Sequence, residues 1–299
     1  MERRSGAKNK VISLLFALIF PAGYLLSQVI VAFIAAFCIA MVAIMGAGGL
    51  DTAISGNLTL AITAISGVLT AVAAVLTIKL SRKSVKTELR VRNPGAVTLV
   101  LALVLGVSMN LASSALISVI PFPDWMVNSY NEQVSNALLE GSSPVLMICV
   151  VGVLVPIVEE ICLRAMPLRA LRRAYPAAAA AVIGGAIFAL IHGNLLQIIY
   201  VLPVGIILCF VYIWTESVIA TIALHIGYNG FSAIMSALPS GDIDASAALT
   251  EDMTGLYVGM AIAFTAITAV LVVIMYRRRV VMVPVWNNFP ENSSNNSVQ

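Results

Sequence analysis

Residues 145–167 read VLMICVVGVLVPIVEEICLRAMP, an apolar stretch long enough to cross a lipid bilayer as a helix. Such a helix needs roughly 20 apolar residues. Glu159, Glu160 and Arg164 interrupt this stretch. Ionisable groups inside a bilayer cost on the order of 2.5–3.5 kcal/mol each on insertion scales, so they persist where they have a partner or face water. The stretch therefore predicts a membrane helix that carries a polar site.

Most of the remaining chain has the same apolar character. Hydrophobic residues make up 60% and charged residues 10% of the 299 residues, and the mean hydropathy is +1.00. Such a composition leaves too little polar surface to cover a water-soluble particle. Further apolar runs occupy residues 11–47, 58–78, 96–120, 177–191, 195–214, 218–238 and 256–276. We expect an all-α integral membrane protein, a polytopic helical bundle of about eight transmembrane helices.

The basic residues predict how these helices are oriented. Lysines and arginines cluster before residue 11, within residues 79–92, within residues 169–173 and at residues 277–279. All four clusters fall on one side of the membrane if each run crosses it once, and cytoplasmic loops are enriched in Lys and Arg. Both termini are therefore expected to be cytoplasmic. Because the clusters flank apolar runs, they indicate orientation and no nucleic-acid partner.

The chain is expected to fold as one domain surrounded by membrane lipids. This transmembrane domain covers residues 1–283, and its first run is either one tilted helix or a surface segment that leads into a helix. Residues 121–143 are too polar to span and have the aromatic content of a segment at the outer interface. The Asn- and Ser-rich residues 284–299 are expected to form a disordered cytoplasmic tail.

Two further clusters place polar side chains inside apolar runs. Phe188 and His192 are four residues apart, as are His225 and Asn229, and these are the only two histidines of the chain. Residues four apart lie on the same face of a helix. Intramembrane histidines often only join helices by hydrogen bonds, which is the ordinary structural reading of each one alone. The coincidence of three such clusters on successive runs favours a functional site.

Helical spacing separates the roles of the two glutamates. Glu160 and Arg164 are four residues apart and can form an ion pair, so we interpret Glu160 as a structural carboxylate. Glu159 points about 100° away and has no cation one turn from it, which leaves it free to act as a general base. An imidazole and a carboxamide directed at one point, as His225 and Asn229 are, suit the stabilisation of an oxyanion. A carboxylate, a proton-carrying imidazole and an oxyanion pocket together predict hydrolysis of an amide bond.

The three clusters resemble the signature of the CAAX-protease and bacteriocin-processing (CPBP, Abi) family of intramembrane glutamic proteases. That family includes the type II CAAX prenyl endopeptidases. Its signature is Glu-Glu-x-x-x-Arg, then Phe-x-x-x-His, then His-x-x-x-Asn on successive helices of an all-helical membrane fold. The resemblance covers about residues 145–238 of this chain.

The resemblance implies a role for each matching residue. Glu159 would activate a water molecule with the help of His192, while His225 and Asn229 would form the oxyanion hole. The Glu160–Arg164 pair would orient the site. We therefore expect an intramembrane endopeptidase that cleaves without a covalent intermediate and needs no metal or cofactor. Its substrate would be a peptide or a membrane-associated protein, prenylated or not.

Two alternatives use the same residues. A zinc-dependent membrane protease is one, because two histidines and carboxylates suit that ion. A non-catalytic transport or immunity protein is the other, in which the same groups pass protons or bind a solute. We expect a multi-pass protein of a bacterial plasma membrane, with its site in the cytoplasmic half and opening inward. Counted from the predicted inner helix ends, Glu159 and His225 lie at moderate depth and His192 lies deeper.

Overall fold

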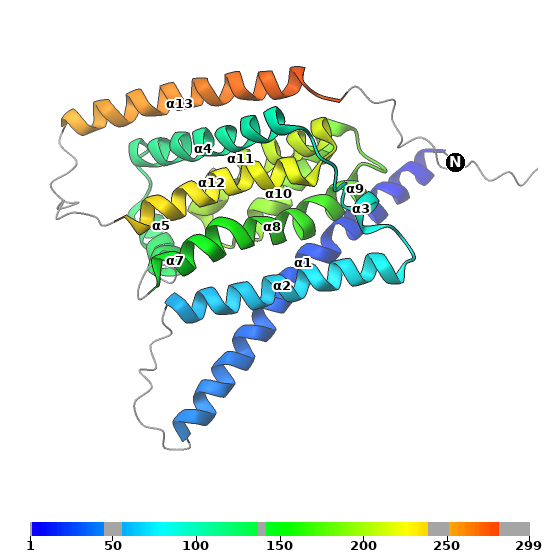
Figure 1. The fold of residues 1–299 in the computed structure, drawn as a ribbon, viewed down its shortest axis with the longest axis horizontal. Coiled ribbons are helices and arrows are strands. Elements are labelled where there is room, and N and C mark those ends of the chain that lie inside the picture. Colours follow the sequence, from blue (N-terminus) through cyan, green and yellow to red (C-terminus); the bar gives the residue numbers. More distant parts are fainter. Residues whose placement is uncertain (1, 45–55, 137–141, 239–250, 281–299) are drawn as a thin grey trace, which may run out of the picture.

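The computed structural model describes residues 2–44, 56–136, 142–238 and 251–280, and the described part of the chain contains helices and no strand (Figure 1). Six helices are long, namely α1 (Glu2–Ile44), α2 (Gly56–Leu80), α4 (Ala96–Val119), α11 (Leu195–Thr215), α12 (Val218–Ala237) and α13 (Glu251–Arg277). The shorter ones are α3 (Val85–Glu88), α5 (Asp124–Tyr130) with its π-helical extension η1 (Asn131–Asn136), and α10 (Ala177–Leu190). The predicted tail, residues 284–299, lies outside the described residues.

Seven helical stretches within the described ranges are long and apolar enough to cross a membrane, which confirms a polytopic helical membrane protein. They are Lys8–Met41, Gly56–Leu80, Ala96–Val119, Pro144–Leu171, Leu195–Thr215, Val218–Ala237 and Met253–Arg277. The one predicted run that is not among these seven, residues 177–191, forms α10, which has 14 residues. Its length of about 21 Å is less than the roughly 30 Å of a hydrocarbon core. Extensive packing against α11 places α10 inside the bundle rather than across it as a full span.

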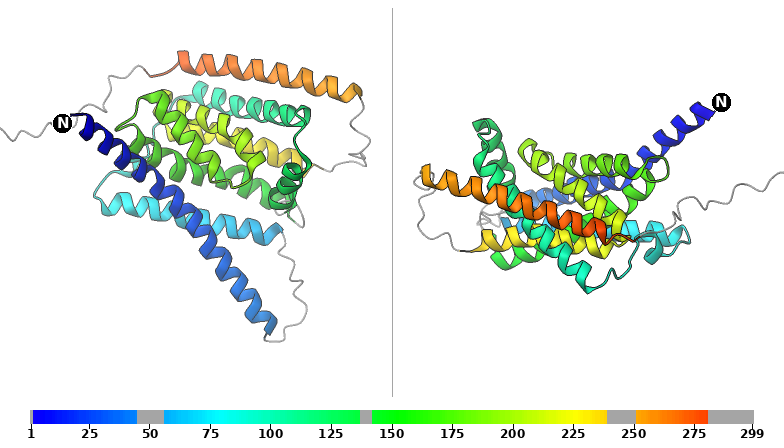
Figure 2. Two further views of the ribbon diagram at one scale, coloured as in Figure 1. Left: turned by 180° about the vertical axis from the view of Figure 1, so that it is seen from behind. Right: turned by 90° about the horizontal axis from the view of Figure 1, so that it is seen from above.

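The first apolar run is a single helix as far as it is described. α1 continues unbroken through Pro21. It crosses the bundle obliquely against α2 and α9, and its C-terminal part projects away from the other helices (Figure 2). Of the two readings of this run, the single helix agrees with the described residues, and its tilt in the membrane stays a prediction.

The Glu-Glu pair lies on one continuous helical stretch that changes from α-helical to π-helical winding twice. The stretch comprises α7 (Pro144–Met147), the π-helical turns η2 (Ile148–Leu154) and η3 (Glu160–Ala165), α8 (Val155–Glu159) and α9 (Met166–Leu171). Each π-helical turn precedes a proline, Pro156 and Pro167 respectively. Proline has no backbone N–H and removes one hydrogen bond of the helix, so the turn before it rewinds. Such π turns are frequent at functional sites.

Close backbone contact fixes the helix that carries the second histidine. A Cβ atom added at Gly227 of α12 would lie 2.2 Å from the carbonyl oxygen of Leu103 in α4. One added at Gly106 of α4 would lie 1.9 Å from the carbonyl oxygen of Leu224 in α12. Small residues allow membrane helices to approach this closely. The crossing therefore holds α12 firmly beside α4, with His225 next to the contact.

The basic segments gather at one end of the bundle. The N-terminus, α3, α9 and the C-terminal end of α13 lie there, whereas α5 and α7 lie at the opposite end (Figure 1). Arg169 Nη1 of α9 lies 2.8 Å from Glu88 Oε2 of α3, and Arg90 pairs with Glu216 at the end of α11, so ion pairs stabilise this end of the bundle. The predicted grouping of Lys and Arg on one side agrees with this arrangement. The cytoplasmic position of that end stays a prediction.

Candidate active site

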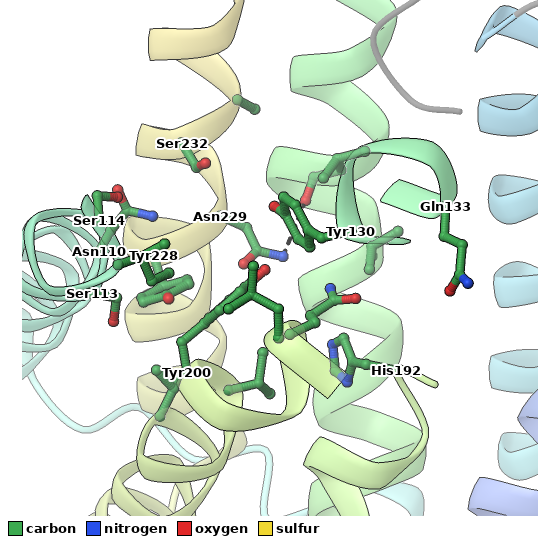
Figure 3. Close-up of a pocket in the computed structure, with 18 of the residues that line it drawn as sticks. Asn110, Ser113, Ser114, Tyr130, Gln133, His192, Tyr200, Tyr228, Asn229 and Ser232 are labelled. Atoms are coloured by element: carbon green, nitrogen blue, oxygen red, sulfur yellow. Dashed lines mark hydrogen bonds between the residues drawn. The ribbon is translucent and has the colours of Figure 1, made fainter. Parts of the chain in front are cut away.

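A cavity of about 920 Å³ brings together four of the six predicted site residues. Glu159 at the end of α8, His192 just after α10, and His225 and Asn229 on α12 all line it. His192 and Asn229 face into the cavity in Figure 3. Glu159 is only 7% exposed and His225 only 3% exposed, so these two form its deep wall. The polar side chains of three separate helical segments thus share one space inside an apolar bundle.

Glu160 and Arg164 lie behind that wall and are fully buried. Arg164 Nε lies 3.2 Å from Glu160 Oε2, which is the ion pair that the spacing predicts. Arg164 Nη1 also donates to the carbonyl oxygen of Gly205 at 3.1 Å and to Cys209 Sγ at 2.8 Å. A buried ion pair is stable when its geometry is good and further hydrogen bonds satisfy the charged groups. Arg164 therefore ties the Glu160 carboxylate to α11.

His225 sits between the two glutamates. Its Nδ1 atom lies 3.0 Å from Glu160 Oε1, and its Nε2 atom lies 3.7 Å from Glu159 Oε2. An ionised carboxylate can only accept a hydrogen bond, so Nδ1 carries the proton and donates it. In the neutral ring, Nε2 presents its lone pair toward Glu159, whereas a ring that carries protons on both nitrogens presents Nε2–H to the same carboxylate.

His192 is held by the backbone of its own helix. Its Nδ1 atom lies 2.8 Å from the carbonyl oxygen of Phe188. Because a carbonyl oxygen only accepts, Nδ1 is the donor, and in the neutral ring Nε2 is left free to accept a proton. Its side chain is half-buried on the cavity wall. His192 is therefore suited to receive or relay a proton.

The Phe188 ring joins the three charged or titratable groups around it. Its centroid lies 5.1 Å from that of the His192 ring and 5.6 Å from that of the His225 ring, both in edge-to-face geometry. The guanidinium carbon of Arg164 lies 4.8 Å from the same centroid. Aromatic and cation–π contacts of this kind fix orientation as well as adding stability. Phe188 thus sets the relative position of the two histidines.

Asn229 lies one helical turn beyond His225 on the same face of α12. Its amide nitrogen is 3.5 Å from the carbonyl oxygen of Val151, a long hydrogen bond. A carboxamide has two N–H groups, so the side chain can hold this contact and still offer a donor to the cavity. Donors from His225 and Asn229 therefore converge on the same wall.

Tyr24 of α1 is the residue at this site that the sequence pattern does not identify. Its hydroxyl group interacts with the Glu159 carboxylate and with the side chain of Gln28, and the residue is 4% exposed. Tyr24 and Gln28 both line the cavity. Tyr24 and Gln28 are four residues apart, so a search for polar one-turn pairs in the first apolar run would have found them. Which residues this face of α1 contacts is decided by tertiary packing and cannot be predicted from the spacing.

Metal binding needs a denser group of ligands than the described residues provide. No three His, Cys, Asp or Glu side chains among them are placed to hold a metal ion together. A structural or catalytic zinc site takes at least three protein ligands. The arrangement of the described side chains therefore gives the zinc alternative no ligand set.

Comparison with protein families gives a match for the middle part of the chain. Residues 141–231 match a protein-family model described as Type II CAAX prenyl endopeptidase Rce1-like. The matched segment contains all six predicted site residues and leaves out α1, α2, α4 and α13. No curated protein and no solved structure matches the chain.

Proposed function

Residues 141–231 match the model of the Rce1-like type II CAAX prenyl endopeptidases, and on that premise we propose that this membrane protein is an endopeptidase in which Glu159 activates water. One observation carries the proposal. A buried carboxylate, two imidazoles and a carboxamide line a single cavity inside a bundle of membrane helices. Hydrolysis of a peptide bond needs a base, a proton relay and a stabilised oxyanion, and these four groups can supply all three.

The first step is the attack of water on the peptide carbonyl carbon. Glu159 takes a proton from the water as the new carbon–oxygen bond forms, which is general-base catalysis. The free Nε2 atom of His192 lies on the same cavity and can relay that proton. The proton then passes to the leaving amine nitrogen as the carbon–nitrogen bond breaks. No bond to the protein forms at any stage.

His225 and Asn229 stabilise the negative charge that develops on the carbonyl oxygen. With its ring protonated, His225 presents Nε2–H at the deep wall, one turn from the Asn229 amide. Oxyanion donors of this kind are worth about 2.7–4 kcal/mol each in measured enzymes. Glu160 holds the opposite side of the His225 ring, and Arg164 holds Glu160. These last two residues are therefore positioning residues that do not touch the substrate.

The decisive experiment compares the peptides released by cells that carry the parent chain with those released by cells that carry Glu159→Gln. Fragments that depend on the parent identify the substrate, and the purified variants are then assayed on it. Glu159→Gln is expected to reduce the cleavage rate at least a thousandfold, because the base is lost while the shape of the side chain is kept.

Glu132→Gln is the matched control, since it makes the same chemical change at an exposed position of η1 that does not line the cavity. Its cleavage rate should equal that of the parent. Equal melting temperatures of the variants show that folding is intact. Cleavage by Glu159→Gln at the parent rate would overturn the proposal, and solute uptake in proteoliposomes without any cleavage would favour the transport alternative.

A further inference from the structure

The cavity extends from the buried glutamate toward one end of the bundle only. Its lining includes the first turns of α2, the C-terminal half of α4 with the turn that follows it, parts of α5 and η1, and the C-terminal half of α12. These segments all lie at the end that carries α5 and α7, opposite to the basic segments (Figure 1). No lining residue comes from residues 64–109, 160–187 or 205–224, which lead to and from the basic end.

Exposure changes along the cavity in the same direction. Ser232 and Ser236 of α12 and Gln133 of η1 are exposed, whereas Glu159 and His225 are buried. His225 and Ser236 are 11 positions apart in one regular helix, a distance of about 16 Å. On the other side of the glutamates, the fully buried Glu160–Arg164 pair blocks the way to the basic end. The cavity is thus a pocket that is open at one end and closed at the other.

The charge pattern assigns a side of the membrane to each end. The segments at the closed end carry the lysines and arginines of residues 79–92, 169–173 and 277–279. The described segments at the open end, residues 119–136 and 236–238, contain Asp124 and Glu132 but no Lys or Arg. Loops rich in Lys and Arg stay in the cytoplasm. The closed end is therefore the cytoplasmic one.

From this placement, and resting on the proposed function, we infer that the cavity takes its peptide substrate from the non-cytoplasmic side of the membrane. The substrate is then an exported peptide or the outward-facing part of a membrane protein. This assignment departs from the sequence-based expectation of a site that opens inward. Depth counted along each helix locates the catalytic groups, but it does not reveal which end of the cavity the Glu160–Arg164 pair closes.

The lining also indicates which part of a substrate the cavity accepts. Apart from Glu159 and the two histidines, the cavity walls carry neutral side chains, among them the amides of Gln28, Asn110 and Gln197. Such groups can satisfy the backbone N–H and C=O groups of an extended peptide. None of the described residues that line the cavity is Lys or Arg, so the terminal carboxylate of a short peptide would find no basic partner among them. The lining therefore favours an internal peptide bond in an uncharged segment.

Thiol labelling tests the orientation independently of catalysis. Ser236→Cys and Ser81→Cys form a matched pair, since both serines are exposed and lie within one residue of a helix end, at the open and the basic end respectively. Both variants are made with Cys38→Ser and Cys149→Ser, which removes the two exposed native thiols and leaves the two buried ones. A membrane-impermeant maleimide should label Ser236→Cys in intact cells and Ser81→Cys only after permeabilisation. The reverse pattern overturns the inference.

A second pair of variants links the opening to cleavage. Ser232 lines the cavity, whereas Ser118 of α4 is exposed near the same end but does not line it. In the same cysteine background, maleimide treatment of intact cells should reduce cleavage at least tenfold for Ser232→Cys and leave Ser118→Cys unchanged.

The two proposals fail separately in these experiments. Labelling of Ser236→Cys from outside, in a protein whose Glu159→Gln variant cleaves as fast as the parent, supports the orientation and refutes the catalytic proposal. Cleavage that depends on Glu159, together with labelling of Ser236→Cys only from the inside, refutes the orientation alone.

Discussion

Removing the charge of Arg164 should destabilise the bundle strongly, because Glu160 would lose its cation while staying fully buried. Arg164→Met keeps a long side chain but deletes the guanidinium and its hydrogen bonds to Gly205 and Cys209. Breaking a buried ion pair by removing one partner typically costs about 3–5 kcal/mol. We expect a decrease of that size in the free energy of unfolding.

Glu160→Gln is the complementary change. The carboxamide oxygen can still accept a hydrogen bond from His225, but the Arg164 charge is left buried without its counter-ion. Its expected cost is again about 3–5 kcal/mol. The double variant Glu160→Gln/Arg164→Met buries neither charge, so it should be less destabilised than either single variant. The resulting coupling energy is expected to be about 3 kcal/mol or more, as for residues in direct contact.

The assay is equilibrium unfolding of the purified protein in detergent micelles, followed by circular dichroism, for the parent and the three variants. Cleavage is measured on the same preparations. The double variant should be folded yet cleave at least tenfold more slowly than the parent, because the Nδ1 atom of His225 then faces a carboxamide in place of the Glu160 carboxylate. Strictly additive losses of stability in the double variant would refute the reasoning, since they would show that the two charges do not stabilise each other in the bundle.

Three further predictions test other contacts of the site and the fold. Tyr24→Phe removes the hydroxyl group that interacts with Glu159. Because a hydrogen bond to a charged group is lost, cleavage should slow about tenfold or more, while the melting temperature should not fall. An unchanged cleavage rate argues against that contact. Gly227→Ala places a methyl group 2.2 Å from the carbonyl oxygen of Leu103 and should cost about 1–3 kcal/mol of stability, whereas Gly255→Ala, with open space around it, should cost nothing measurable in thermal unfolding. Exhaustive chelation should leave the cleavage rate unchanged, and a loss that zinc restores would support the metal alternative.

Hydropathy alone determines the fold class of this chain. The apolar runs correspond to the long helices, because the cost of leaving backbone groups unpaired in lipid forces each run into a helix whatever surrounds it. The number of full membrane spans could not be predicted as well from the lengths of the runs. The run at residues 177–191 forms α10, which is too short for a full span and packs against α11.

Pairs within one helix could also be predicted from the sequence. The Glu160–Arg164 ion pair and the contact between Phe188 and His192 follow from a spacing of four residues, which helical hydrogen bonding fixes locally.

Contacts between helices were decided by the tertiary structure. His225 meets Glu160 across 65 positions of sequence, and Tyr24 reaches Glu159 from a helix outside the family match. The end at which the cavity is open was likewise decided by the way the helices pack against one another. The rotation and crossing of packed helices depend on close contacts such as the one at Gly227, and the pattern of any single helix does not contain that information.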